Sequence, residues 1–168
     1  MVTTMERCPV CGGASPMRAD TCEERREIAG VLFSAPVACD ACTICGEKFV
    51  GFEALARFEL EAAAALALRG RRTGSALRFM RSALGYRSAE LAGLLDVAPE
   101  TFSRWETGDR EPDARAFALV GSLATDRLNG GNHTLAMLRA MREPARIEPG
   151  ETVRLERVDR RWVNSGER

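Results

Sequence analysis

The chain has 168 residues, of which 45% are hydrophobic, and its 24 basic and 24 acidic side chains leave no net charge. This length suits one ordinary domain or two small ones, and the hydrophobic content excludes an intrinsically disordered chain. No apolar run approaches the roughly 20 residues that span a bilayer, and the first residues lack the apolar core of a signal peptide, so we expect a cytoplasmic protein with no membrane partner.

Two pairs of cysteines dominate the first third of the chain. The pairs are Cys8 with Cys11 and Cys42 with Cys45, each has two intervening residues, and each is followed by glycine. Two intervening residues let one tight turn direct both sulfurs at the same metal ion, and the glycine lets the turn close with a positive φ. Two such pairs form the ligand set of a closed four-thiolate zinc site, which holds structure and has no open position for catalysis. The sequence therefore predicts one structural Zn²⁺ bound by these four cysteines.

Two further cysteines leave alternatives open. Cys39 and Cys42 are also separated by two residues, but Thr43 follows Cys42 where glycine follows Cys45, so the pair Cys42 and Cys45 is preferred. Cys22 and Cys39 are then spare. The simplest interpretation is that they are small buried residues, and a disulfide between them is the alternative. For the four zinc candidates, the alternative is a thiol-redox role.

The segment before the first predicted helix has too few apolar residues to form a core unaided. We expect residues 1–50 to be a small zinc-binding β module with two or three short strands and with Gly30 at or near a turn. Residues 51–73 are predicted to be a connecting helix and linker. The helix covers 52–69, ends at Gly70, and is followed by a linker at 70–74.

Five helices are predicted in residues 74–144. They cover 75–84, a segment capped by Ser88, a segment from Pro99 to the stop at Gly108, a segment capped by Asp113, and 132–141. Residues 145–168 are predicted to be a C-terminal tail, in which 151–158 alternate weakly and form either one short strand or a frayed end. The expected fold class is α+β.

The second and third of these helices carry a helix-turn-helix pattern. Ala92 is small where two helices cross, Val97 fills the turn, and the spacing of Phe102 and Trp105 turns them inward, while Glu106 can pair with Arg81. The residues left facing outward on the second helix of the pair are the candidates to enter a DNA major groove. They are Pro99, Glu100, Thr101, Ser103 and Arg104, and Arg87 is a candidate for a phosphate contact.

This stretch resembles the Xre/Cro/phage-repressor class of helix-turn-helix domains. The resemblance covers about 75–125 and is carried by the residues Ala92, Val97, Phe102, Ser103, Arg104, Trp105, Glu106, Gly108 and Pro112. It implies a five-helix DNA-binding domain that binds a double-stranded operator as a homodimer.

The chain also resembles the YgiT-type zinc-finger/helix-turn-helix family, which includes MqsA-type antitoxins. The resemblance lies in the order of the parts: a module with two cysteine pairs, then a helix, then the helix-turn-helix domain. The resemblance implies a repressor that reads bases with Arg104 and Glu100, and, if it is an antitoxin, a cognate toxin as partner. The chain departs from the family pattern at Ala89, where a phosphate-anchoring glutamine is usual, and at Glu100, where asparagine is usual. An ionised glutamate only accepts hydrogen bonds, so it would prefer a cytosine amino group.

No catalytic grouping is present: the sequence has no phosphate loop, no nucleophile elbow and no zinc-protease motif, and we expect that the protein is not an enzyme. The alternative to a DNA-binding repressor is a protein-binding adaptor, or a toxin-neutralising module, without specific DNA binding. Glu100 and Arg104 are four apart on the expected helix, so they could also pair with each other instead of reading bases.

Overall fold

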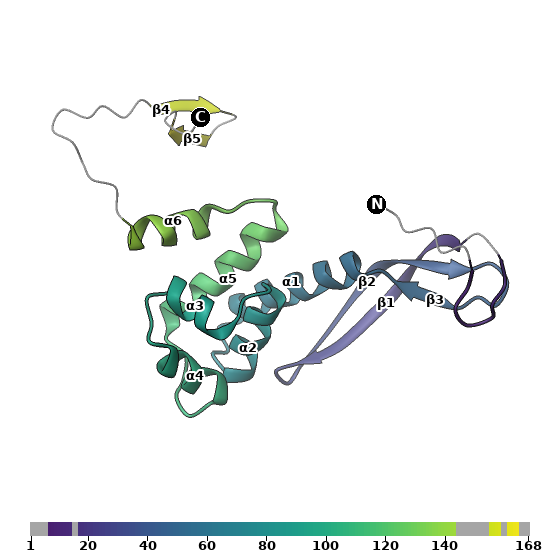
Figure 1. Ribbon diagram of the computed structural model, residues 1–168, viewed down its shortest axis with the longest axis horizontal. Helices are drawn as coiled ribbons and strands as arrows, with labels where there is room; N and C mark the ends of the chain where they lie inside the picture. The colour runs from purple at the N-terminus through teal and green to yellow at the C-terminus, as the bar shows by residue number, and fades with distance from the viewer. Residues whose placement is uncertain (1–6, 15–16, 144–154, 159–160, 165–168) are drawn as a thin grey trace.

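The computed structural model describes residues 7–14 and 17–143, and the backbone of two further strands at 155–158 and 161–164. Its N-terminal part is a three-stranded antiparallel sheet in the order β1 (Met17–Ile28), β2 (Val31–Cys42) and β3 (Lys48–Val50). Helices follow: α1 (Phe52–Leu68), α2 (Gly74–Ala83), α3 (Ser88–Leu94), α4 (Pro99–Thr107), α5 (Ala114–Leu128) and α6 (His133–Arg142). The predicted α+β class is confirmed, with the sheet and its four-cysteine cluster preceding the helices (Figure 1).

Strands β1 and β2 form one long hairpin. Its loop is Ala29 and Gly30, and both have positive φ values, 52° and 75°. Positive φ at both loop residues is the type I′ conformation, whose twist matches that of the flanking strands. The turn at Gly30 was predicted, but the expectation of short strands is wrong, because β1 and β2 each run for 12 residues. β1 carries charged residues on both faces, so its sequence does not alternate as a half-buried strand usually does.

The two ends of this hairpin have different neighbours. At the turn, Ile28 is buried in the helical core, and Val31 and Phe33 pack against that core. Arg26 of β1 donates to the carboxylate of Glu59 on α1 at 2.5 Å, and the Arg69 guanidinium lies 5.8 Å from the centre of the Phe33 ring. The other end, where β2 finishes at Cys42 and pairs with β3, lies away from the helices and carries the cysteine cluster (Figure 1).

Helix α1 is part of the helical core as well as the connection from the sheet. Its buried residues include Ala63 and Leu66, and α1 packs against α5. The helices approach so closely that a Cβ added at Gly121 of α5 would collide with the side chain of Ala67. This proximity explains the alanine-rich sequence of α1, since small side chains let two helix backbones come together. The division of the chain at residues 50, 73 and 144 stays a prediction.

Local signals account for the ends of the next helices. Asp113 caps α5 by accepting hydrogen bonds from the backbone N–H groups of Arg115 and Ala116, as predicted. Gly108 ends α4 with φ at 87°, a value that favours glycine. The expected cap of α3 is wrong by one residue. Arg87 precedes the helix instead of Ser88, and its backbone N–H donates to the Glu90 carboxylate at 2.7 Å.

Helix α6 follows α5 and has no buried residue, although Leu135 and Leu138 pack against the core. Farther along, β4 (Leu155–Val158) and β5 (Arg161–Asn164) pair antiparallel. Residues 155–158 are therefore a strand, whereas 151–154 of the predicted segment lie outside the described residues. Within the described part of the chain, none of the helices is both long and apolar enough to cross a bilayer.

Candidate metal centre and helix-turn-helix surface

The two cysteine pairs form two turns with the same hydrogen-bond pattern. In the first, the Cys8 carbonyl accepts from the N–H of Gly12 at 2.9 Å, and in the second the Cys42 carbonyl accepts from Gly46 at 2.9 Å. Both glycines have positive φ, 69° and 74°. The glycines after each pair therefore have the role that the sequence predicted, because a side chain would strain each turn. In each turn the first cysteine is buried and the second is exposed.

The turns bring the four predicted ligands together. The sulfurs of Cys8 and Cys45 lie 3.8 Å apart, as do those of Cys11 and Cys42, and all four lie within 4.8 Å of one another. Four sulfurs placed tetrahedrally at the usual zinc–sulfur distance of about 2.3 Å would be about 3.8 Å apart. The spacing therefore fits a four-coordinate zinc ion, and the cluster could hold a metal ion such as zinc.

Backbone hydrogen bonds favour the thiolate form in this cluster. The N–H groups of Cys45 and Ile44 donate to the sulfur of Cys42, and this lowers the pKa of the Cys42 thiol to about 6. For Cys45, the N–H of Glu47 acts in the same direction, but burial and the neighbouring sulfurs outweigh it and raise the pKa to about 12. Four thiols this close cannot all ionise unless a cation neutralises them, which is what a bound metal ion does.

The two remaining cysteines lie outside the cluster and bind each other. Cys22 on β1 and Cys39 on β2 are joined by a disulfide, with their Cα atoms 6.0 Å apart. The simpler prediction, that they are only small buried residues, is wrong, and the alternative disulfide is observed. The pairing follows from the register: Cys22 lies opposite Val37, so Cys39 is its diagonal neighbour across the two strands. Because its sulfur is bonded to Cys22, Cys39 is not available to bind a metal ion. Cys42 and Cys45 are the pair that joins the cluster, as the sequence analysis preferred.

The helix-turn-helix segment is built as its pattern predicts. Helices α3 and α4 are joined by residues 95–98, Ala92 and Phe102 are fully buried, and Trp105 is 4% exposed. Phe102 and Trp105 meet edge to face, with ring centres 5.9 Å apart. This packing fixes which side of α4 faces outward.

An ion pair between α2 and α4 supports the same orientation. Nε of Arg81 donates to Oε1 of Glu106 at 2.7 Å, as predicted from the sequence, and Glu106 is 9% exposed. The guanidinium of Arg81 also donates to the Tyr86 carbonyl at 2.7 Å. This one arginine therefore links α2, α4 and the segment that leads into α3.

Of the predicted DNA-contact residues, five lie on α4. Pro99 begins the helix, Thr101 is half-buried, and Glu100, Ser103 and Arg104 are exposed. Among the described residues, neither the Arg104 guanidinium nor the Glu100 carboxylate has an ion-pair partner, so the two do not pair with each other. Arg87 lies outside α4, at the residue before α3, and is exposed.

No protein-family model matches the chain. A comparison with curated protein sequences found no match either. The geometry by itself gives a four-sulfur cluster that could bind a metal ion, a disulfide beside it, and an outward-facing α4 held by a buried ion pair.

Proposed function

We propose that the protein is a zinc-binding, sequence-specific DNA-binding regulator that represses transcription by occupying an operator. The observation that carries this proposal is the exposed face of α4. Phe102 and Trp105 anchor the opposite face in the core, which leaves Ser103 and Arg104 directed to solvent. A short helix anchored in this way, after a tight turn from a preceding helix, is the arrangement that inserts into the major groove.

Each exposed group on α4 has a role that its chemistry allows. A free arginine donates two parallel hydrogen bonds to guanine, and such a contact contributes roughly 1–3 kcal/mol of discrimination between bases. Glu100 accepts from a cytosine amino group, and Arg87 contacts a backbone phosphate. Two copies of the chain would place two α4 helices in successive major grooves, about 34 Å apart, on a two-fold symmetric site.

The zinc module gives the protein a second surface. Val10 and Ile44, at equivalent positions in the two cysteine turns, are 64% and 63% exposed. Exposed apolar side chains at both turns suit a protein partner. This feature and the resemblance to YgiT-type proteins support an MqsA-like antitoxin function, in which the zinc module binds a toxin and the helix-turn-helix represses the operon.

Binding of the zinc-loaded full chain to DNA from its own upstream region tests the proposal. We expect a footprint, and an affinity that falls steeply with salt because phosphate contacts release counterions. Arg104→Ala should abolish the footprint. Arg25→Ala, which removes the same charge from an exposed position on β1, should leave the footprint intact. Equal effects of the two variants would contradict a recognition role for α4.

The protein-binding alternative makes the opposite prediction. A pure adaptor would show no footprint at any salt concentration, whereas it would form a complex with the product of a neighbouring reading frame. Replacing Val10 and Ile44 by aspartate would break that complex and leave the DNA footprint of a true repressor unchanged. The two activities are therefore separable in one protein.

A further inference from the structure

The six cysteines of this chain fall into two groups with different sulfur chemistry. Four of them form the cluster in which all sulfurs lie within 4.8 Å of one another. The other two, Cys22 and Cys39, form a disulfide that runs diagonally between β1 and β2. Since four sulfurs complete a tetrahedral zinc site, the metal centre has no need of Cys22 or Cys39.

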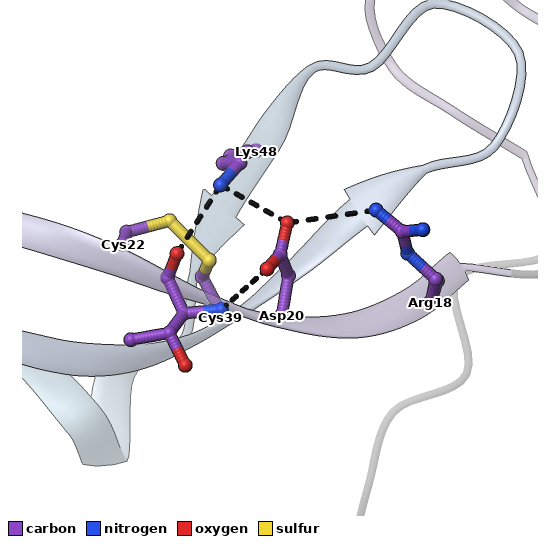
Figure 2. Close-up of a disulfide and its surroundings, with 6 residues drawn as sticks. Arg18, Asp20, Cys22, Cys39 and Lys48 are labelled. Atoms are coloured by element: carbon purple, nitrogen blue, oxygen red, sulfur yellow. Dashed lines mark hydrogen bonds and ion pairs between the residues drawn. A yellow bond between two sulfur atoms is a disulfide. The ribbon is translucent and has the colours of Figure 1, made fainter.

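The surroundings of the disulfide make its two sulfurs unequal. Cys39 is 6% exposed, whereas Cys22 is half-buried and so more accessible. Figure 2 shows the Lys48 side chain reaching from β3 across to the strand of Cys22, beside the disulfide. Its ammonium donates to the carbonyl of Thr21, the residue before Cys22, at 3.2 Å and pairs with Asp20 at 3.0 Å. Lys48 shares its charge with the Asp20 carboxylate, and its position next to the strand of Cys22 favours the thiolate of Cys22 once the disulfide is reduced. The thiolate is the form that attacks oxidants.

We propose that Cys22 and Cys39 are a reversible, peroxide-responsive thiol pair in which Cys22 reacts first and Cys39 resolves. The Cys22 thiolate attacks one oxygen of hydrogen peroxide, the oxygen–oxygen bond breaks, and the other oxygen leaves as water after taking a proton. This leaves a sulfenic acid on Cys22. The sulfur of Cys39 then displaces the hydroxyl as a second water and forms the disulfide. Two thiols lose two electrons, and one peroxide becomes two waters. A dithiol reductant reverses the reaction by exchange.

The position of the disulfide gives this chemistry a structural consequence. The bond lies between the turn end of the hairpin, where Ile28 enters the helical core, and the end that carries the cluster. Cys39 also lies opposite Val50 of β3, so the bond sits where all three strands are paired. Oxidation therefore fixes covalently the strands that support Cys42, and reduction leaves only hydrogen bonds between them. We expect the oxidised protein to release its metal to a chelator more slowly than the reduced protein.

Thiol counting on the full chain is the first measurement. The reduced, zinc-loaded protein should show six free thiols when it is unfolded with a chelator. If the folded, zinc-loaded protein is first treated with one equivalent of hydrogen peroxide, it should show four, and these should map to Cys8, Cys11, Cys42 and Cys45. The zinc-loaded Cys39→Ser variant, treated with peroxide and dimedone, should gain one dimedone adduct at Cys22. The Cys22→Ser variant should gain none at Cys39. Both variants should keep their zinc, because neither residue is a ligand.

Lys48 provides a matched comparison of rates. Lys48→Met should slow the reaction with peroxide several-fold, and Lys48→Arg, which keeps the charge, should react at nearly the rate of the parent. Peptide mapping of the unmutated protein checks the pairing without any substitution. An adduct on a cluster cysteine instead of Cys22 would overturn the proposal, as would a disulfide that dithiothreitol cannot reduce in the folded chain. Neither result depends on whether the protein binds DNA.

Discussion

Replacing Arg81 by alanine should destabilise the helical part of the protein far more than the loss of an ordinary surface charge. The side chains of Arg81 and Glu106 are only 18% and 8% exposed, and they form a 2.7 Å ion pair between α2 and α4. Removing the arginine leaves the Glu106 carboxylate buried without its partner, and leaves the Tyr86 carbonyl without the donor it has at 2.7 Å. Breaking a buried pair from one side costs about 3–5 kcal/mol of unfolding free energy.

An exposed pair on α1 gives the matched comparison. Arg57 and Glu61 are four residues apart, lie 2.9 Å apart and have side chains that are 69% and 46% exposed. Pairs of this kind contribute about 0.3–0.5 kcal/mol, because water and salt screen them. For a unit of fewer than 100 residues, 1 kcal/mol shifts the Tm by about 4–8 °C, so Arg81→Ala should lower it by roughly 12 °C or more. Arg57→Ala should lower it by a few degrees at most.

Thermal melts followed by circular dichroism at 222 nm measure both effects. A double variant, Arg81→Met with Glu106→Leu, should recover much of the lost stability, since it removes the buried carboxylate together with its partner. Equal losses in Arg81→Ala and Arg57→Ala, or a double variant as unstable as the sum of its single changes, would refute the reasoning. In that case α4 would be held by its aromatic core alone.

Three other predictions use the same melts. Gly121→Ala should lower stability by about 1–3 kcal/mol through overpacking against Ala67, whereas Ser122→Ala on the exposed side of α5 should change little. Asp113→Ala should lower the Tm at neutral pH. The N–H of Ala116 holds the pKa of the Asp113 carboxyl below its usual range. The stabilisation by the ionised Asp113 cap is therefore present above about pH 4 and is lost as the pH falls further. A difference in Tm between the variant and the parent that does not change with pH would contradict this prediction. Arg104→Ala should leave the Tm unchanged, because its guanidinium is exposed, and a large loss would make Arg104 structural.

The helices could be predicted closely because their signals are local. Pro99, Gly108 and Asp113 each act within one turn of the backbone, and the structure places all three at the predicted helix ends. The Arg81–Glu106 pair was also predictable, since a known pattern of inward-facing residues fixed the relative positions of the two helices.

The hairpin could not be predicted as well, because its length depends on pairing between distant residues. Gly30 indicated a turn, but β1 is charged on both faces and Ala29 stands where an asparagine would have identified a two-residue hairpin, so the two long strands were not recognised. Without the register, nothing in the sequence showed that Cys22 and Cys39 are diagonal neighbours. The packing of α1 against α5 was missed for a similar reason, since it depends on the contact between Ala67 and Gly121, which are far apart in the chain.

The central claim is that a metal ion bound by four thiolates organises the N-terminal part of the chain. The most direct test is the zinc content of the purified full chain, measured by mass spectrometry together with the number of thiols that react before and after a chelator is added. We predict one zinc per chain, with the thiols of Cys8, Cys11, Cys42 and Cys45 protected until the chelator releases them. A metal-free chain that stays fully folded, with all four thiols reactive and no gain of stability on adding zinc, would contradict the claim.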